Sequence, residues 1–387
     1  MLMFQMQIYS PKEDSYLLEK AVKKYSKGSV LDMGTGSGIQ ANNAVKRKNV
    51  TKVTATDINK SCSKLLSKKI KFIHSNLFQK IPKQKFDTII FNPPYLPQDK
   101  GITDATIYGG KKGYEITERF LNTCNSYLAT KGTILLLFSS HTNKKKVDEI
   151  IENNCFEKGE IDSKQLPMFE ELFVYKIKKS KLLLNLENKK ITDVKKFAKG
   201  KRGIIFVGKL KNKKVAIKVK RKDSFAKGNI ANEVKWLKIL NKKNIGPKLI
   251  NKGKDYFIYE FIDGQFISDF INSCKNKKRV LAIIKKVMEQ CRKLDKLQVN
   301  KEEMHHPYKH IIIRNNNPVM VDFERCKKTK KPKNVTQFCQ FLVSGYFLEL
   351  LRTKGIRLNR SEILLAAKDY KRNKNDERFS ELTKCIK

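Results

Sequence analysis

Short apolar runs alternate with amphipathic stretches from the start of the chain to about Lys178. Stretches such as Ser15–Lys24 and Tyr114–Ala129 carry apolar residues at helical spacing, so they predict helices. Strands that alternate with helices predict an α/β fold built on a parallel sheet. The short runs predict strands over Ser29–Asp32, Lys52–Thr56, Lys71–His74, Thr88–Phe91, Thr133–Phe138 and Leu172–Ile177.

The pattern changes after this point. Residues 179–200 are rich in lysine and show little hydrophobic periodicity, which predicts a linker. Beyond the linker, Ile204–Val207 and Lys214–Val219 predict two strands joined by a turn. A helix is predicted to follow over Ile230–Asn241. Strands and helices of this kind, grouped rather than alternating, predict an α+β domain.

The length of the chain also indicates two domains. Its 387 residues exceed what one hydrophobic core usually holds, and hydrophobic residues make up 40%, which is enough for packed cores. We expect an α/β domain over residues 1–178, a lysine-rich linker over 179–200 and an α+β domain over 201–387. The tail of the second domain, from about Gln337, has a helical pattern.

The charge is strongly positive. Lysine and arginine number 83 against 38 acidic residues, which gives a formal net charge of +45. Such a field favours RNA, the ribosome, acidic proteins or anionic membranes as partners. The lysines are spread along the whole chain, however, so a lysine-biased composition without any such partner explains the charge equally well.

The cysteines and the apolar runs bear on location. None of the eight cysteines forms a CxxC pair, so neither a disulfide framework nor a zinc-binding spacing is indicated, and a reducing cytosol fits. The apolar start, Met1–Tyr9, lacks a basic segment and is too short to span a membrane. No later apolar run is long enough. We therefore expect a cytoplasmic protein without a membrane segment.

A glycine-rich segment follows the first predicted strand. Because Gly34, Gly36 and Gly38 lack a Cβ, the backbone there can turn tightly and approach a ligand closely. Asp57 closes the second predicted strand about 20 residues further on, where an acidic residue holds ribose hydroxyls. The alternative role for Asp57 is a helix N-cap. Together these residues predict a site for a ligand that contains a nucleoside.

The segment Asn92-Pro93-Pro94-Tyr95 follows the predicted strand Thr88–Phe91. An amide or aromatic amine nitrogen is a poor nucleophile, so its N–H groups must be held by acceptors while it is methylated. The Asn92 side-chain oxygen and the Pro93 carbonyl can act as these acceptors. The two prolines stiffen the loop, and Tyr95 offers a flat face to a planar group. A plain turn is the alternative, because asparagine and proline are turn residues.

These residues resemble those of the release-factor glutamine methyltransferases, the HemK group, in their archaeal and eukaryotic branch. Tyr9-Ser10-Pro11-Lys12-Glu13-Asp14-Ser15 is similar to the N-terminal signature of that branch, and Gly109-Gly110-Lys111-Lys112-Gly113-Tyr114-Glu115 to the loop that follows its Asn-Pro-Pro-Tyr turn. The resemblance implies a Rossmann-like class I methyltransferase domain over residues 1–178. It also implies a protein substrate, a peptide chain release factor methylated on the glutamine of a Gly-Gly-Gln motif.

The resemblance further implies which residues form the site. Asn92, Pro93, Pro94 and Tyr95 would be catalytic. By similarity, S-adenosylmethionine would be bound by Ser15, Asp32, Gly34, Asp57 and Asn76, and the glycine-rich segment adds Gly36 and Gly38. The family more often has aspartate at the position of Asn76, but asparagine can still form hydrogen bonds with adenine. Members of this branch usually need a small zinc-binding activator protein, which would pair with the edge strand Ile70–His74.

Two other functions remain open. Adenine-N6 methylation of DNA or RNA would use the same Asn-Pro-Pro-Tyr chemistry, although residues 1–178 contain no candidate for the domain that would recognise and flip a base. A lysine-rich protein that binds RNA or the ribosome and retains vestigial catalytic parts is the non-enzymatic alternative.

The second domain resembles atypical archaeal Ser/Thr kinases that are similar to lipopolysaccharide kinases and Rio kinases. Lys218 in Val215-Ala216-Ile217-Lys218 matches the strand lysine of protein kinases, with Glu233 as its helix partner and Asp322 where a metal is held. Gly200, Gly203 and Gly208 lie where a phosphate-covering loop would be. The resemblance implies a kinase-like domain over residues 201–387 that takes ATP and Mg²⁺.

One departure puts phosphoryl transfer in question. The expected catalytic loop, Met304–His310, has no aspartate at the position of the base, and His310 stands near the place of the usual metal-binding asparagine. The base is then missing or replaced by a histidine. A plain surface ion pair is the alternative reading of Lys218 and Glu233.

Overall fold

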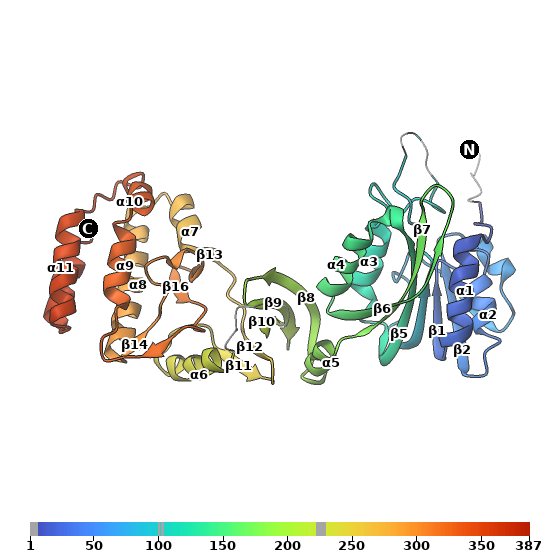
Figure 1. The fold of residues 1–387 in the computed structure, drawn as a ribbon, viewed down its shortest axis with the longest axis horizontal. Helices are drawn as coiled ribbons and strands as arrows, with labels where there is room; N and C mark the ends of the chain where they lie inside the picture. Colours follow the sequence, from blue (N-terminus) through green and yellow to red (C-terminus); the bar gives the residue numbers. More distant parts are fainter. Residues whose placement is uncertain (1–6, 100, 102–103, 222–229) are drawn as a thin grey trace. The chain divides into compact units, whose positions relative to one another are not determined.

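The computed structural model describes residues 7–99, 101, 104–221 and 230–387. Most of the predicted apolar start, Met1–Tyr9, lies outside these residues. The chain forms two compact units, Met1–Lys196 and Phe197–Lys387, which are described here one at a time (Figure 1). Within the described ranges, no helix combines the length and the apolar character that crossing a bilayer requires. All eight cysteines are free thiols, and seven are buried.

The first unit is built on a seven-stranded sheet in the order β3-β2-β1-β4-β5-β7-β6. Neighbouring strands pair in parallel from β3 to β5, while β7 is antiparallel to both β5 and β6. The fold is the Rossmann-like fold of class I methyltransferases. The strands are β1 (Gly28–Met33), β2 (Val50–Asp57), β3 (Ile70–His74), β4 (Phe86–Phe91), β5 (Leu128–Ser139), β6 (Phe156–Gln165) and β7 (Glu171–Lys179).

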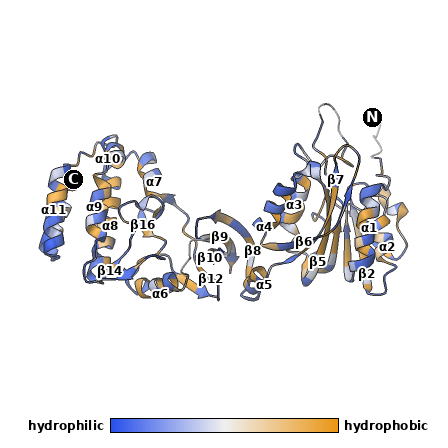
Figure 2. Ribbon diagram, in the orientation of Figure 1, coloured by the Kyte–Doolittle hydropathy of each residue, from blue (hydrophilic) through white to orange (hydrophobic). Residues whose placement is uncertain are grey.

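Helices cover both faces of this sheet (Figure 1). One face carries α1 (Glu13–Tyr25) and α2 (Ile39–Ala44), whose apolar residues join those of the strands in one buried cluster. The other carries α3 (Glu115–Cys124) and α4 (Lys144–Asn153), and the ring of Phe120 on α3 packs at a tilt of 38° against Phe91 of β4. Figure 2 shows apolar residues along the strands between these layers. Two short 3-10 helices, η1 (Lys60–Leu65) and η2 (Ser140–Thr142), complete the unit.

The sequence pattern missed β6. This edge strand has the sequence Phe-Glu-Lys-Gly-Glu-Ile-Asp-Ser-Lys-Gln, and only its first residue is buried. A strand that is exposed along almost its whole length needs no apolar residues, so it leaves no apolar run in the sequence.

The segment expected to be a linker is structured. Residues 181–188 form α5 (Lys181–Asn188) and residues 191–199 form β8 (Ile191–Lys199). The Ser180 hydroxyl caps α5, whose Leu183 and Leu186 are buried. Such short elements bury few apolar residues, so they leave little hydrophobic pattern in the sequence. The three consecutive leucines Leu182–Leu184 also obscure the helical period. The predicted linker over 179–200 is therefore wrong.

The second unit begins within β8, the last strand of a five-stranded sheet in the order β11-β12-β10-β9-β8. The pairs β9–β10, β10–β12 and β11–β12 are antiparallel. The helix that follows β10 is α6 (Ile230–Leu240), and a 3-10 helix, η3 (Asn241–Lys243), extends it. The strands are β9 (Gly203–Leu210), β10 (Lys213–Lys220), β11 (Leu249–Lys252) and β12 (Tyr256–Glu260).

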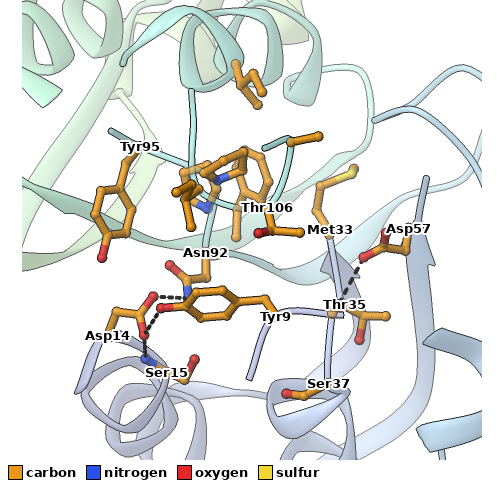
Figure 3. Close-up of a pocket in the computed structure, with 18 of the residues that line it drawn as sticks. Tyr9, Asp14, Ser15, Met33, Thr35, Ser37, Asp57, Asn92, Tyr95 and Thr106 are labelled. Carbon is orange, nitrogen blue, oxygen red and sulfur yellow. Dashed lines mark hydrogen bonds between the residues drawn. The ribbon is translucent and has the colours of Figure 1, made fainter. Parts of the chain in front are cut away.

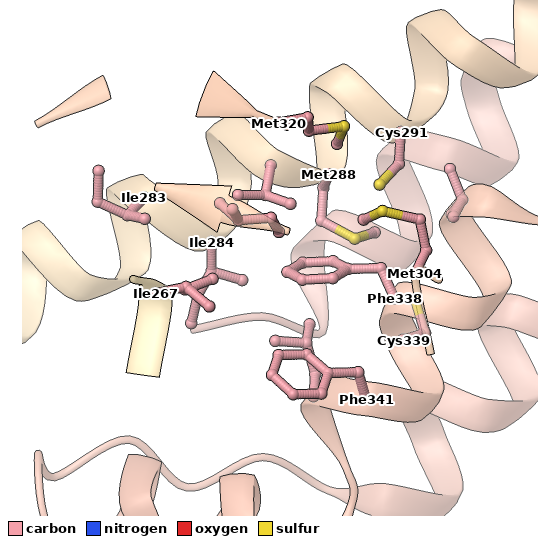
Figure 4. Packing of buried hydrophobic residues seen from close by; sticks show 14 of the residues in the cluster. Ile267, Ile283, Ile284, Met288, Cys291, Met304, Met320, Phe338, Cys339 and Phe341 are labelled. Atoms are coloured by element: carbon pink, nitrogen blue, oxygen red, sulfur yellow. The ribbon is translucent and has the colours of Figure 1, made fainter. Parts of the chain in front are cut away.

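A mainly helical part follows, with small sheets of β13–β15–β16 and β14–β17. Its core packs aliphatic, aromatic and sulfur-containing side chains, among them Met288, Phe338 and Phe341 (Figure 4). The elements are β13 (Gln265–Phe266), α7 (Ile267–Ser273), α8 (Lys277–Lys296), β14 (Val299–Asn300), η4 (Pro307–Lys309), β15 (Ile311–Arg314), β16 (Asn317–Met320), β17 (Lys327–Lys328), α9 (Asn334–Leu342), α10 (Gly345–Arg352), α11 (Arg360–Arg372) and α12 (Asp376–Lys384).

Candidate functional site

A cavity of about 510 Å³ lies where the carboxyl ends of β1, β2 and β4 meet, and its volume suits a small-molecule ligand. This is the edge at which open α/β sheets bind ligands. Ten of the eleven residues predicted for this site line the cavity: Ser15, Asp32, Gly34, Gly36, Asp57, Asn76, Asn92, Pro93, Pro94 and Tyr95.

Gly38 is the exception. It is not among the cavity's lining residues but stands at the N-cap of α2, with φ at 79°. A Cβ at this position would lie 2.7 Å from Leu66 Cδ2. Gly38 therefore allows the chain to turn from the loop into α2, and its contact with the ligand stays a prediction.

Asp32 holds the glycine loop in place. Its Oδ2 accepts hydrogen bonds from Thr35 Oγ1 at 2.6 Å and from the Ala41 N–H at 3.1 Å. The carboxyl is 1% exposed, and this burial raises its pKa to about 7. Asp32 thus joins the loop to the first turn of α2, and both of its hydrogen bonds are made within the protein.

Asp57 also contacts the loop. Its Oδ2 accepts from the Gly36 N–H at 2.9 Å and its Oδ1 from the Asn59 N–H at 2.8 Å. The helix N-cap, the alternative role for Asp57, falls to Asn59, whose side chain accepts from the Ser61 N–H at the start of η1. Further along the cavity wall, the Asn76 side-chain oxygen accepts from Arg119 Nη2 at 3.1 Å.

Asn92 is held by Asp14, an acidic residue of the N-terminal signature that was not among the site residues named from the sequence. Its Nδ2 donates to Asp14 Oδ2 at 3.0 Å, and Asp14 Oδ1 accepts from Tyr9 OH at 3.2 Å and from the Ser15 N–H at 2.6 Å (Figure 3). Asp14 is 3% exposed. These contacts fix the amide of Asn92 with its nitrogen toward Asp14. The Asn92 Oδ1 is buried and has no hydrogen-bond partner among the described residues.

The loop that follows Asn92 is packed against the backbone of residues 109–113. Gly109 N–H donates to Leu96 O at 2.9 Å, and a Cβ on Gly109 would lie 2.5 Å from Pro94 O. Tyr95 O accepts from Thr142 Oγ1 at 3.2 Å. Burial, followed by the nearby Asp14 charge, raises the pKa of the Tyr95 phenol above its ordinary value, so this ring stays neutral. The loop therefore presents fixed carbonyls and an uncharged aromatic ring.

A second cluster of charged groups lies in the second unit. Lys218 Nζ, on β10, lies 2.6 Å from Glu233 Oε2, 3.0 Å from Asp322 Oδ1 and 3.6 Å from Glu324 Oε2. Although burial opposes the charge, Glu233 and Asp322 raise the pKa of the Lys218 ammonium. Burial likewise opposes the charge of Asp322, but the neighbouring Lys218 lowers its pKa to about 2. Lys218, Glu233 and Asp322, which were predicted as a set, are thus in contact.

Other groups surround this cluster. Glu233, Asp322 and Glu324 hold oxygens within 4.8 Å of one another, a spacing that could bind a metal ion, and Glu324 had not been singled out from the sequence. Gly200 and Gly203 close the turn between β8 and β9, and a Cβ on Gly203 would lie 3.4 Å from Lys218 Cε. Gly208 lies within β9 instead. Burial lowers the pKa of His310 to about 4.

Known methyltransferases match this chain. A family model described as "Methyltransferase small domain" matches residues 12–165. The "Putative protein N5-glutamine methyltransferase" of Methanocaldococcus jannaschii is 36% identical over 180 residues, which are 43% of this chain and 90% of that protein. The "Release factor glutamine methyltransferase" of Aquifex aeolicus is 29% identical over 147 residues, 33% of this chain and 51% of that protein.

Among solved structures, one chain of the E. cuniculi Mtq2-Trm112 complex, described as methylating the eRF1 translation termination factor, is 27% identical to this chain. The match covers 45% of this chain and 99% of that one, with a TM-score of 0.39. The chain thus spans nearly all of the M. jannaschii protein and about half of the A. aeolicus protein.

Proposed function

The chain belongs to the protein N5-glutamine methyltransferases, and from this premise we propose that its first unit methylates the side-chain nitrogen of a glutamine in a peptide chain release factor. The methyl donor is S-adenosylmethionine, in keeping with the class I methyltransferase fold. The observation that carries the proposal is the buried Asn92 Oδ1 in the wall of the cavity, which has no hydrogen-bond partner within the part of the chain that the structure describes.

A buried oxygen without a partner costs free energy, about 1–3 kcal/mol for a neutral polar group. This cost is recovered when a ligand donates a hydrogen bond to the oxygen. The carboxamide of a glutamine has two N–H groups, so Asn92 Oδ1 can accept one and the Pro93 carbonyl the other. With both N–H groups held in this way, the nitrogen is fixed in one orientation, and positioning is the main contribution that such a site makes to methyl transfer.

S-adenosylmethionine supplies a methyl group on a positively charged sulfur. The residues of the cavity fit this ligand: Asp57 provides a carboxylate for ribose hydroxyls, and Gly34 and Gly36 allow close backbone approach. We assign Ser15 and Asn76 to the same ligand. Asp32 acts on S-adenosylmethionine indirectly, because it holds the glycine loop in place. As the amide nitrogen gains a methyl group it loses one proton, which Asn92 Oδ1 or the Pro93 carbonyl hydrogen-bonds until it leaves to water.

Transfer of a labelled methyl group tests the proposal. The acceptors are a release factor with its Gly-Gly-Gln motif, the same factor with that glutamine changed to alanine, and DNA and RNA that contain adenine. Label on the intact factor alone is the expected result. Label on nucleic acid would instead support adenine-N6 methylation, and RNA binding without any methyl transfer would support the non-enzymatic alternative.

A small zinc-binding protein is the proposed partner of the first unit. The observation that supports it is the position of β3, which is one of the two edge strands of the sheet and pairs, among the described strands, with β2 alone. An added strand can pair with such an edge. The partner is expected to co-purify with the full chain and to raise the rate of methyl transfer, whereas separate elution and an unchanged rate would count against it.

The net charge of +45 is consistent with work near the ribosome in the cytoplasm.

For the second unit, we propose a kinase-like domain that binds ATP with Mg²⁺. The contact of Lys218 with Glu233 and Asp322 supports it, because in kinases such a lysine pairs with a helix glutamate and holds nucleotide phosphates, while a nearby aspartate holds Mg²⁺. No aspartate is present over residues 304–310, so phosphoryl transfer is left out of the proposal. Calorimetric titration of ATP with Mg²⁺ into the full chain and into Lys218→Met tests the assignment: binding that Lys218→Met retains would contradict it.

A further inference from the structure

The turn between β6 and β7 exposes two large apolar side chains. Met168 is 91% exposed and Phe169 is 100% exposed. They occupy a three-residue loop, Pro167–Phe169, that is closed by a hydrogen bond from the Leu166 N–H to Glu170 O at 2.8 Å. Exposing apolar side chains to water is unfavourable in free energy. An exposed pair at the end of a hairpin therefore indicates a contact with another molecule.

The backbone of this turn is also strained. Met168 has φ at 58° and Phe169 has φ at 60°, the left-handed region that bulky side chains rarely adopt. Tight hairpin turns of this shape normally use glycine or asparagine. Two large apolar residues at positions that favour glycine are best explained by a use for their side chains, since the fold would be more stable without them.

The turn adjoins the cavity. Leu166 and Glu170, which flank it, both line the cavity wall. Ser139 at the carboxyl end of β5 pairs with Leu172 of β7, so the turn extends from the sheet at the edge where the cavity opens (Figure 1). Glu170 Oε1 is buried without a partner among the described residues, which shows that the hairpin also contributes an unused acceptor to the cavity.

The charge around the turn indicates the class of partner. Within a chain of net charge +45, the segment Lys164–Glu171 holds one basic and two acidic residues, Glu170 and Glu171. Phosphate backbones and anionic lipid surfaces require basic residues at their contacts, so this segment suits neither. An apolar tip beside two carboxylates suits a protein surface with an apolar hollow.

We propose that Met168 and Phe169 form an apolar anchor that inserts into a hollow on the folded protein substrate, next to the glutamine that enters the cavity. The inference rests on the proposed function and adds the surface by which the substrate is recognised. The anchor would bind substrate without touching the reacting atoms. Its loss should therefore weaken substrate binding and leave the rate of the bound complex unchanged.

The test compares the full chain with Met168→Ser/Phe169→Ser, with Met168→Gly/Phe169→Gly and with a matched control, Leu365→Ser, which removes an apolar side chain that is 62% exposed in the second unit. The substrate is a folded release factor. We expect both double variants to raise KM for the factor about tenfold or more while kcat stays within about twofold, as loss of an apolar anchor predicts. The control should match the wild type.

The glycine variant separates the anchor from a structural role. Glycine relieves the strained backbone of the turn. The melting temperature of Met168→Gly/Phe169→Gly should therefore equal or exceed that of the wild type, although the KM of this variant for the release factor rises. An unchanged KM in both double variants, or a lower kcat at unchanged KM, would overturn the anchor while leaving the proposed function intact. If the wild type itself fails to methylate the factor, the proposed function fails and this inference fails with it.

Discussion

Changing Asp14 to asparagine should nearly abolish methyl transfer while leaving the fold and the cofactor affinity intact. In the structure, Asp14 Oδ1 accepts two hydrogen bonds, from Tyr9 OH and the Ser15 N–H, whereas Oδ2 accepts one, from Asn92 Nδ2. In Asp14→Asn the single remaining oxygen should take the place of Oδ1, because two donors point there. The new amide nitrogen then faces Asn92 Nδ2.

Two donors cannot share a hydrogen bond, so the Asn92 amide should turn over. Its oxygen would then accept from position 14, and its nitrogen would point toward the substrate. The site would offer a donor where the glutamine N–H needs an acceptor. Losing one preorganised hydrogen bond at a reacting group costs about 3 kcal/mol, or roughly a 10²- to 10³-fold decrease in kcat.

The assay is single-turnover methyl transfer, combined with calorimetric titration of S-adenosylmethionine. We expect the dissociation constant to stay within about threefold of the wild type, because Asp14 acts through Asn92. The double variant Asp14→Asn/Asn92→Ala should be no slower than Asn92→Ala alone, since residues that act as one unit are not additive. Activity of Asp14→Asn close to that of the wild type, or additive losses in the double variant, would refute the reasoning.

Three further predictions concern stability and the second unit. Gly38→Ala should destabilise the first unit by about 1–2 kcal/mol, because φ is 79° there; an unchanged calorimetric melting temperature would contradict this. Burial raises the pKa of Asp32 to about 7, above its unfolded value, so the carboxyl favours folding at low pH and loses this contribution as the pH rises through 7. The melting temperature of the first unit should thus fall between about pH 4 and pH 7 in the wild type and fall less in Asp32→Asn, and equal slopes would count against the assignment. Lys218→Met removes the ammonium that pairs with the buried Glu233 carboxylate and should destabilise the second unit by about 3–5 kcal/mol without changing methyl transfer; loss of methyl transfer would show that the units depend on each other.

Much of the first unit could be predicted from the sequence because its central strands are buried on both faces. Each such strand leaves a short apolar run, and the glycine loop and the Asn-Pro-Pro-Tyr segment follow two of these runs directly. The strand β6 and the elements α5 and β8 could not be predicted in this way. They are short or largely exposed, and their few buried residues produce no clear period.

The missed parts of the site depend on contacts between distant residues. Asp14 is 78 residues from Asn92 in the chain, and nothing in the local sequence distinguishes it from Glu13 beside it. Its place next to Ser15, a predicted ligand residue, within the N-terminal signature Tyr9–Ser15 was the available signal. Gly38 was grouped with Gly34 and Gly36 by spacing alone, but spacing does not show which glycines face the ligand and which shape the turn into α2.

The measurement that tests the central claim most directly is the location of the methyl group on the product. The full chain is incubated with S-adenosylmethionine and a release factor, with its small partner present, and the product is fragmented in a mass spectrometer beside an Asn92→Ala reaction. We predict one added methyl group on the side-chain nitrogen of the Gly-Gly-Gln glutamine, and none with Asn92→Ala. A methyl group on another residue, or equal methylation by Asn92→Ala, would contradict the account.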